Sequence, residues 1–399
     1  MDHARAPEPR EPWSAVLALG ITQITAWGSI YYLFPLLMEP LQAALGANKS
    51  SVVGAFTLSL LISGVLAPVV GRAIDRRGGR MLMAAGSLLA ALALAALGQV
   101  TSLAQLYAVW ALLGVAMAGT LYEPAFAVLT RAFVNNHRRA IAVLTLFGGF
   151  ASTVFWPLGQ ALIDAFGWRA TAMIFGTLHL AVCVPLHLIV LPRGSSRGAE
   201  PSTQAPSRSL GDALRTPVFY LLAASFTFNA LVFSAMTIHL LAMIIAKGLT
   251  AAQAAALGAL IGPMQVAGRL AEMTFGQRIS PPTVGLIAGG LLPASILLLA
   301  ITEPSVTSFL LFALLFGAGN GVMTIVRGTI PVEFFGRAHY GVVNGALAAP
   351  VLIAKAFGPL VAAMAWAWTR DYDSVALMLA AVGLCSLAFF ALAMRWRRR

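Results

Sequence analysis

Long apolar runs separated by short polar breaks dominate the pattern of this chain. Residues 52–70 and 81–100 contain no charged side chain, and each run is long enough for a helix of about 20 residues that crosses a bilayer. Along the whole chain, the pattern predicts an all-α integral membrane protein with twelve membrane-spanning helices. The predicted spans are 13–38, 50–71, 81–100, 103–130, 139–162, 168–191, 216–246, 251–276, 283–302, 305–333, 340–366 and 373–394.

The widest polar break divides the chain into two halves of six predicted spans each. It contains Gly, Ser, Pro and four arginines, a composition typical of a flexible linker. Residues that lie 202 positions apart also match between the halves, as in the pairs Gly119 and Gly321, Phe133 and Phe335, and His137 and His339. The sequence therefore predicts two pseudo-symmetric six-helix bundles, 13–191 and 216–394, with a tail at 1–12, a linker at 192–215 and a basic tail at 395–399.

The composition agrees with this interpretation, because the chain is 59% hydrophobic and only 10% charged. A soluble domain has about 25% charged residues. The net charge of +12 would indicate nucleic acid as a partner of a soluble protein, but here the arginines border the apolar runs. Topology and anionic lipid account for that distribution, so we expect the lipid bilayer as a partner and no nucleic acid.

Basic residues are distributed unequally between the two sides of the predicted helices. The two tails and the even-numbered loops hold nineteen of the 26, whereas the odd-numbered loops hold four, namely Lys49, Arg169, Lys247 and Arg370. Because basic loops stay in the cytoplasm, we expect a multi-pass protein of the inner (plasma) membrane with both termini in the cytoplasm. The remaining basic residues lie within predicted spans and are Arg269, Arg327 and Lys355.

The most charged run in the first half is the short loop 71–80 between predicted spans 2 and 3. Gly71 would let two helices approach closely, and Gly78 and Gly79 permit a tight turn. The pattern Gly71-x-x-x-Asp75-Arg76-x-Gly78-x-Arg80 resembles the signature loop of the major facilitator superfamily. The resemblance implies two bundles that rock around a site near the membrane midplane. It also implies a cytoplasmic latch, docked on span 11, that consists of Gly71, Asp75, Arg76, Gly78 and Arg80.

The second half differs from the first in both its loop and its buried charges. At the offset of 202 residues, the counterparts of Gly71, Asp75 and Arg76 are Met273, Gln277 and Arg278. The sequence therefore predicts that the better latch belongs to the first half. The three cations within predicted spans all belong to the second half.

Lys355 and Arg269 are the leading candidates for substrate binding. An ionisable side chain within a span costs about 2.5–3.5 kcal/mol on insertion scales, so such residues usually face a cavity or a partner. Lys355 lies near the middle of span 11, too deep for its side chain to reach either surface. One interpretation is a structural charge paired with a neighbouring helix. The other is a cationic site, since arginine offers a planar fork and lysine a point charge to a carboxylate.

An arginine in span 8 followed by a lysine in the middle of span 11 resembles the oxalate:formate antiporter branch. That resemblance implies that Arg269 and Lys355 bind the carboxylates of a small dianion. The monocarboxylate transporters share the arginine but usually have an aspartate one turn before it, where this chain has Gln265. A small organic anion, a mono- or dicarboxylate, is therefore the favoured cargo.

Glu123 in span 4 and Arg327 in span 10 are expected to face each other at similar depth. The pair either neutralises both charges or forms a gate whose pairing depends on proton or substrate. In the second case Glu123 is the candidate proton carrier and Arg327 supports the anion site. Trp27, Tyr31 and Tyr122 are candidate walls of the cavity, because the resemblance places spans 1, 4, 7 and 10 around it.

The predicted function is secondary active transport by alternating access, with a proton or a second anion as the candidate coupled ion. Export of a drug or metalloid is a second hypothesis, and a transporter-like sensor that signals without turnover is a third. The sequence has no phosphate-cradling loop and no metal-ligand spacing among its histidines. We therefore expect no enzyme activity, no catalytic residue, no metal and no cofactor.

Overall fold

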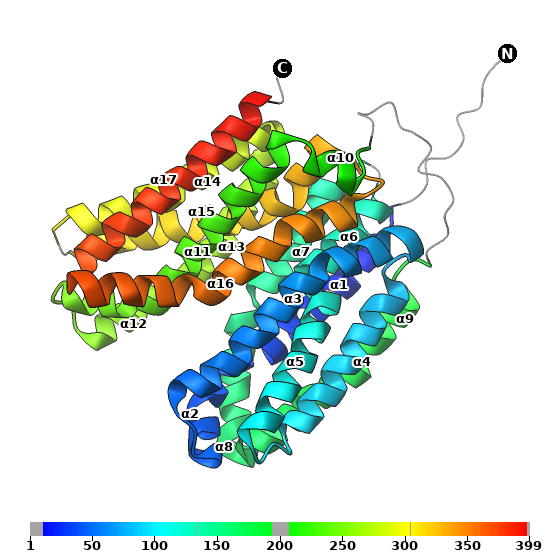
Figure 1. The fold of residues 1–399 in the computed structure, drawn as a ribbon, viewed down its shortest axis with the longest axis horizontal. Coiled ribbons are helices and arrows are strands. Elements are labelled where there is room, and N and C mark those ends of the chain that lie inside the picture. The colour runs from blue at the N-terminus through cyan, green and yellow to red at the C-terminus, as the bar shows by residue number, and fades with distance from the viewer. Residues whose placement is uncertain (1–10, 134, 194–206, 304, 397–399) are drawn as a thin grey trace.

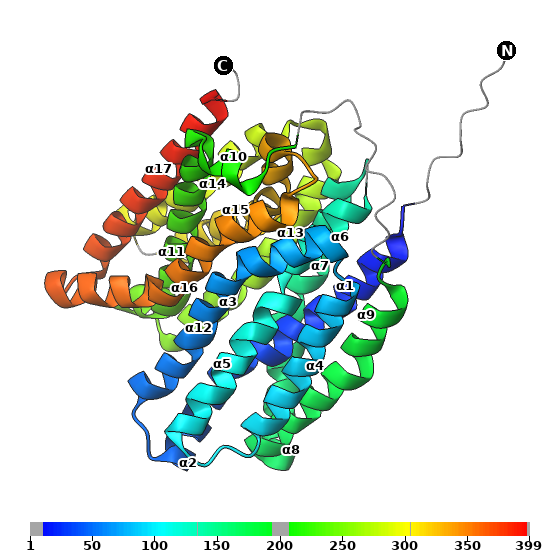
Figure 2. The same ribbon diagram turned by 45° about the vertical axis from the view of Figure 1, so that its right-hand side comes forward.

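The structure is a computed structural model that describes residues 11–133, 135–193, 207–303 and 305–396. Every regular element in these ranges is a helix (Figure 1). Ten helical stretches among the described residues are long and apolar enough to cross a membrane. The described chain begins with α1 and ends with α17 at the same face of the molecule, which we call the termini face (Figures 1 and 2).

The helices of the first half pack around an apolar core that includes Trp110, Leu113 and Phe175. They are α1 (Trp13–Ala26), α2 (Leu33–Leu45), α3 (Lys49–Arg77), α4 (Arg80–Leu97), α5 (Leu103–Thr120), α6 (Tyr122–Ala132), α7 (His137–Gly149), α8 (Ala151–Leu178) and α9 (Val184–Val190). Predicted spans 5 and 6 share one helical stretch, in which Gly167 has a φ of 78° and leaves the helical conformation. This break separates the two predicted spans.

The helices of the second half pack around apolar clusters that include Phe226, Phe312 and Phe390. They are α10 (Leu210–Leu214), α11 (Pro217–Ala246), α12 (Ala251–Ala259), α13 (Ile261–Thr274), α14 (Pro281–Ile301), α15 (Val306–Phe335), α16 (Tyr340–Thr369) and α17 (Tyr372–Trp396). Leu260 interrupts the helix between α12 and α13, so predicted span 8 is built from two pieces. The described helices are thus consistent with twelve spans, and the predicted all-α membrane fold is confirmed.

Among the described residues, predicted spans 1, 4 and 6 are interrupted near their middles. Residues Trp27–Tyr31 form a π turn between α1 and α2, in which the N–H of Tyr32 bonds to the carbonyl of Trp27 at 2.9 Å. A second π turn, His179–Cys183, joins α8 to α9. Leu121 has extended backbone between α5 and α6. Breaks at this depth expose backbone groups, so they usually lie beside functional sites.

The two halves meet along α3 and α16, which lie side by side in both views, and along α7 with α13 and α15 (Figures 1 and 2). The backbones approach closely because small residues face each other there. Gly64 lies against Ala349, and Gly345 lies against Ala67. Since α16 begins at the termini face, the contact at Gly345 lies near that face.

Candidate functional site

Trp27, the first residue of the first π turn, lies at the centre of an aromatic cluster. Its ring centroid is 5.1 Å from that of Tyr31, 5.1 Å from that of Tyr122 and 6.3 Å from that of Tyr32. From the other half, the Nζ of Lys355 lies 5.8 Å from the centroid of the Trp27 ring, a cation–π contact. The structure therefore brings Trp27, Tyr31, Tyr122 and Lys355, all predicted site residues, together between the halves.

The break between α5 and α6 places Tyr122 and Glu123 in the first turn of α6. The side chain of Gln23, on α1, donates from Nε2 to the carbonyls of Thr120 at 2.6 Å and Leu121 at 3.3 Å. Gln23 is 0% exposed, so it satisfies backbone groups that have no access to water at the break. Gln23 is not among the predicted site residues, although an amide inside an apolar span is a signal of a buried polar contact.

Arg269 is a buried cation without a counter-charge among the described residues. It lies on α13 and is 3% exposed. Its Nε donates to the carbonyl of Gly321 at 3.4 Å, and its Nη1 has no hydrogen-bond partner. The ion pairs of the described residues do not include it. Burying a guanidinium without pairing costs several kcal/mol, so this side chain is suited to receive an anion.

The guanidinium of Arg269 reaches toward the first half of the chain. A Cβ at Gly149, on α7, would overlap its Nη1, so the missing side chain leaves room for the guanidinium. A Cβ at the preceding residue, Gly148, would overlap the hydroxyl of Tyr122. Arg269 and Tyr122 therefore lie against adjacent residues of α7, which brings Arg269 to the aromatic cluster.

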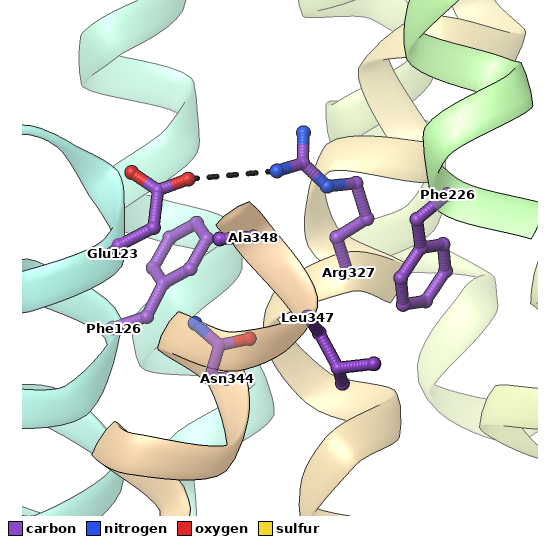
Figure 3. A pocket seen from close by; sticks show the side chains of 7 residues that line it. All are labelled: Glu123, Phe126, Phe226, Arg327, Asn344, Leu347 and Ala348. Atoms are coloured by element: carbon purple, nitrogen blue, oxygen red, sulfur yellow. Dashed lines mark hydrogen bonds and ion pairs between the residues drawn. The ribbon is translucent and has the colours of Figure 1, made fainter. Parts of the chain in front are cut away.

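Glu123 and Arg327 face each other across the boundary between the halves, as the sequence predicts (Figure 3). The Nη2 of Arg327 lies 3.5 Å from the Oε1 of Glu123, and the two side chains are 19% and 17% exposed. They line a small pocket together with Phe126, Phe226, Asn344, Leu347 and Ala348 (Figure 3). Phe126 of this pocket stacks on Tyr122, with ring centroids 5.2 Å apart, so the pair borders the aromatic cluster.

Asp75 caps the first turn of α16 at the termini face. Its carboxylate oxygens accept hydrogen bonds from the N–H groups of Gly341 and Val342, both at 2.8 Å. A carboxylate is stabilised at a helix N-terminus by the unpaired N–H groups and the helix dipole. At Gly71, one turn before Asp75, a Cβ would overlap the carbonyl oxygen of Gly341. Only glycine therefore allows α3 and α16 to approach this closely.

The other residues of the predicted latch have different positions around the same loop. Arg76 is exposed, and the guanidinium of Arg131, on α6, binds the carbonyl of Asp75 instead. Gly78 has a φ of 78° and ends α3, while Arg80 begins α4. The turn geometry therefore depends on Gly78, whereas the contact with α16 depends on Asp75.

Replacing Gly71 with alanine is expected to separate α3 from α16, since the added methyl group would overlap the α16 backbone. Spin labels at the exposed positions Arg76 and Arg278, with Cys385 replaced, would report the distance between the halves at the termini face. We expect this distance to increase by several ångströms. Gly262→Ala is the matched control, because open space surrounds that position on α13. An unchanged distance in Gly71→Ala would show that the contact does not close this face.

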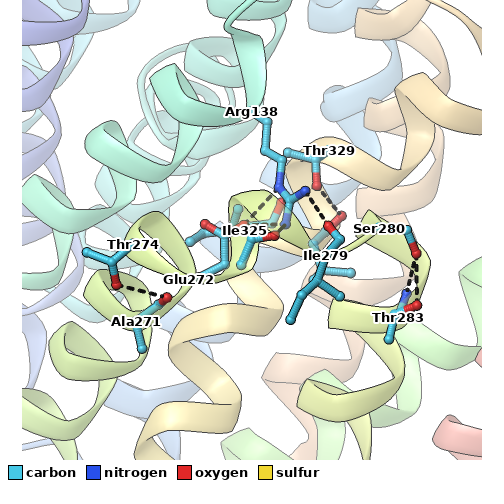
Figure 4. A network of polar contacts seen from close by, with 11 residues as sticks. Arg138, Ala271, Glu272, Thr274, Ile279, Ser280, Thr283, Ile325 and Thr329 are labelled. Atoms are coloured by element: carbon cyan, nitrogen blue, oxygen red, sulfur yellow. Dashed lines mark hydrogen bonds and ion pairs between the residues drawn. The ribbon is translucent and has the colours of Figure 1, made fainter.

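A second contact across the halves joins Arg138, at the start of α7, to Glu272 on α13 (Figure 4). The Nη2 of Arg138 lies 2.7 Å from the Oε1 of Glu272, and the side chains are 14% and 1% exposed. Arg138 also donates to the carbonyls of Gly276 at 2.7 Å and Ile279 at 3.0 Å. The second half therefore has an ionic contact of its own at the termini face.

This contact differs from the prediction that the better latch belongs to the first half. The offset of 202 residues pairs Asp75 with Gln277, whereas the structure makes the contact through Glu272. An acidic residue inside an apolar span is the sequence signal that points to it. Arg337 adds a third contact across the halves by donating from Nη2 to the carbonyl of Thr130 at 2.6 Å.

Comparisons with known proteins agree with this architecture. A sequence profile of the Major Facilitator Superfamily matches residues 19–348. The chain is similar to the oxalate:formate antiporter of Oxalobacter formigenes, with 26% identity over 212 residues that cover 53% of this chain and 50% of that protein. It is also similar to monocarboxylate transporter 11 of Homo sapiens, with 32% identity over 228 residues that cover 53% of this chain and 46% of that protein. The chain thus spans about half the length of these relatives.

A solved structure shares the whole fold. The crystal structure of the human organic anion transporter MFSD10 (TETRAN) superimposes with a TM-score of 0.75. The match covers 97% of this chain and 100% of that one, at 18% sequence identity. At this identity the likeness establishes the arrangement of helices alone.

Proposed function

The chain belongs to the major facilitator superfamily of membrane transporters, and we propose that its cargo is a small organic anion, a mono- or dicarboxylate. The observation that carries this proposal is Arg269, which is 3% exposed and has an Nη1 without a hydrogen-bond partner. A carboxylate has two acceptor oxygens that match the planar fork of a guanidinium. Cargo binding would therefore supply the acceptor that this side chain lacks.

The surroundings of Arg269 support an anion site. Lys355 adds a second cation from α16 and lies against the ring of Trp27. Tyr31 and Tyr122 continue the aromatic wall, and such a wall excludes water and strengthens the attraction between opposite charges. Two relatives are named for carboxylates, oxalate and formate in one and monocarboxylates in the other.

Alternating access in this protein would use the contacts at the termini face. We place both termini in the cytoplasm and the protein in the inner (plasma) membrane, because basic residues concentrate in the tails and even-numbered loops. In that orientation the bonds of Asp75 to α16 and of Arg138 to Glu272 close the cytoplasmic side. Breaking them would let the halves rock and open the site to the cytoplasm.

Glu123 is the candidate for proton coupling. Once its carboxylate takes a proton, its partner Arg327 becomes available to a cargo carboxylate. Gln265, one turn before Arg269, does not titrate, and it accepts a hydrogen bond from Asn320 at 3.2 Å. Exchange for a second anion is the alternative form of coupling.

Replacing Lys355 with glutamine is expected to weaken the apparent affinity for cargo about 10- to 100-fold. This is the effect of losing a charged hydrogen bond worth about 1.5–3 kcal/mol. The measurement is uptake of labelled mono- and dicarboxylates by purified protein in liposomes, with and without a pH gradient. Lys247→Gln is the matched control, since Lys247 follows α11 and pairs with Asp373 at 2.7 Å.

Equal uptake in Lys355→Gln, Lys247→Gln and wild type would argue against Lys355 as an anion ligand. Saturable carboxylate binding without flux in wild type would favour the sensor hypothesis. Transport of a drug or metalloid that carboxylates do not inhibit would favour the efflux hypothesis. Uptake that depends on the pH gradient would identify the proton as the coupled ion.

A further inference from the structure

Two buried histidines of predicted span 6, His179 and His187, lie eight residues apart on the chain. They are 0% and 1% exposed. Each bonds to a hydroxyl side chain on the span that carries Trp27. In the same order, the partners are Ser29 and Thr22. We call these two pairs the hydroxyl ladder.

The first pair of the ladder joins the two π turns. The Oγ of Ser29 lies 2.7 Å from the Nε2 of His179, and both residues are 0% exposed. The Ser29 hydroxyl donates to the carbonyl of Thr25 at 2.6 Å, so its oxygen accepts the bond from the imidazole. In a neutral imidazole the proton is therefore on Nε2, and Nδ1 has no hydrogen-bond partner.

The second pair continues the ladder toward the start of α1. His187 bonds through Nε2 to the Oγ1 of Thr22 at 3.1 Å and through Nδ1 to the Oγ of Ser87 at 3.1 Å. The two histidines of predicted span 6 are thus each matched to a hydroxyl of predicted span 1.

Matched polar pairs of this kind define a single register between two helices. A buried polar group without its partner is costly in an apolar interior, so a shift of α1 by one residue against α9 would be opposed at every pair. A π turn inserts one residue into a helix and rotates the residues that follow. The register of the first π turn therefore decides where Trp27 and Tyr31 point.

We infer that the hydroxyl ladder is a positioning device for the cargo site, holding the first π turn so that Trp27 stays against Tyr122 and Lys355. Ser29 and His179 act through Trp27, because the structure places Trp27 and not these two residues between the halves. The inference rests on the proposed function for the identity of the cargo. The register of the π turn itself does not depend on the cargo.

Hydrogen exchange tests the ladder without any cargo. In Ser29→Ala, the amide protons of residues 27–32 should exchange about tenfold faster than in wild type, because one hydrogen bond to the π turn is lost. His179→Leu should behave in the same way, whereas His179→Gln should keep wild-type protection, since its amide nitrogen occupies the place of Nε2. Ser295→Ala is the matched control, because that 0% exposed hydroxyl bonds within its own helix, to the carbonyl of Leu292 at 2.7 Å.

Transport kinetics test the connection between the ladder and the cargo site. Ser29→Ala should raise the KM for a labelled carboxylate about tenfold and leave the maximal rate nearly unchanged. His179→Gln should keep the wild-type KM. A merely structural role would lower the maximal rate through the amount of folded protein and leave the KM unchanged, so the two roles are separated by this measurement.

If the amide protons of residues 27–32 exchange at the wild-type rate in both Ser29→Ala and His179→Leu, the inference is overturned, whether or not the protein transports carboxylates. Faster hydrogen exchange in Ser29→Ala with an unchanged KM for the labelled carboxylate would overturn the connection to the cargo site. Faster exchange in a protein that takes up no carboxylate would support the ladder and count against the proposed cargo alone.

Discussion

Replacing Arg269 with glutamine is expected to lower carboxylate uptake strongly and at the same time to raise the thermal stability of the protein. The residue is 3% exposed and has no acidic partner among the described residues. Its removal therefore relieves a desolvation cost without leaving an opposite charge unpaired. We expect a gain of about 1–3 kcal/mol in the free energy of unfolding. The same change removes the planar fork that would hold the cargo.

Melting curves in detergent and uptake in liposomes would be measured on the same preparations. Arg278→Gln is the control, because this arginine is exposed beyond the end of α13, and it should change neither quantity. At the same concentration, added cargo should raise the melting temperature of wild type more than that of Arg269→Gln. A loss of stability in Arg269→Gln would show that the guanidinium is already compensated within the protein, contrary to its assignment as an anion ligand.

Arg138→Gln is expected to change stability in the opposite direction. It leaves the carboxylate of Glu272, whose side chain is 1% exposed, without its ion pair at 2.7 Å. Breaking a buried ion pair on one side costs about 3–5 kcal/mol, which is the largest loss of stability that we expect from a single substitution here. Replacing both residues with methionine should recover most of this loss, because no charge is left unpaired.

Thermal unfolding of Arg138→Met, Glu272→Met and the double methionine variant forms a double-mutant cycle for this ion pair. Arg139→Gln is a matched control, since the neighbouring arginine lies over the ring of Trp13 at 5.7 Å rather than against a carboxylate. A double methionine variant no more stable than Arg138→Gln would contradict the ion pair as the origin of the effect.

Two sets of charged groups among the described residues differ in their partners. Asp75, Arg138 and Glu272 are paired across the halves at the termini face. Arg269 and Lys355 form no ion pair among the described residues, and both lie beside the aromatic cluster. We therefore assign closure of the termini face to the first set and cargo binding to the second.

The all-α membrane fold could be predicted from the sequence. An apolar run long enough to cross a bilayer must satisfy its backbone hydrogen bonds without water, and a single run of about 20 residues does so as a helix. The breaks inside the spans could not. The π turn at Trp27–Tyr31 lies in an apolar run, and its anchor is a hydrogen bond between Ser29 and His179, 150 residues apart in the sequence. Such a pairing exists only once the helices are packed.

Buried charges were predictable where both partners lie deep in a span, as with Glu123 and Arg327. The pair of Arg138 with Glu272 was harder to foresee, because Arg138 stands at a helix end and resembles an ordinary loop residue. Arg76 is the opposite case, because the signature pattern includes it in the latch and the structure shows it exposed. At that loop, the guanidinium of Arg131 from α6 binds the carbonyl of Asp75.

Arg269 and Lys355 should together bind the cargo carboxylate beside Trp27, and equilibrium binding of a labelled dicarboxylate to purified protein tests this most directly. Wild type, Arg269→Gln, Lys355→Gln and the double variant would be compared, with the diamide of the same compound as a neutral competitor. We predict that each single change weakens binding about 10- to 100-fold, that the double variant shows no saturable binding, and that the diamide does not compete. Binding of wild-type strength in the double variant would contradict the anion site.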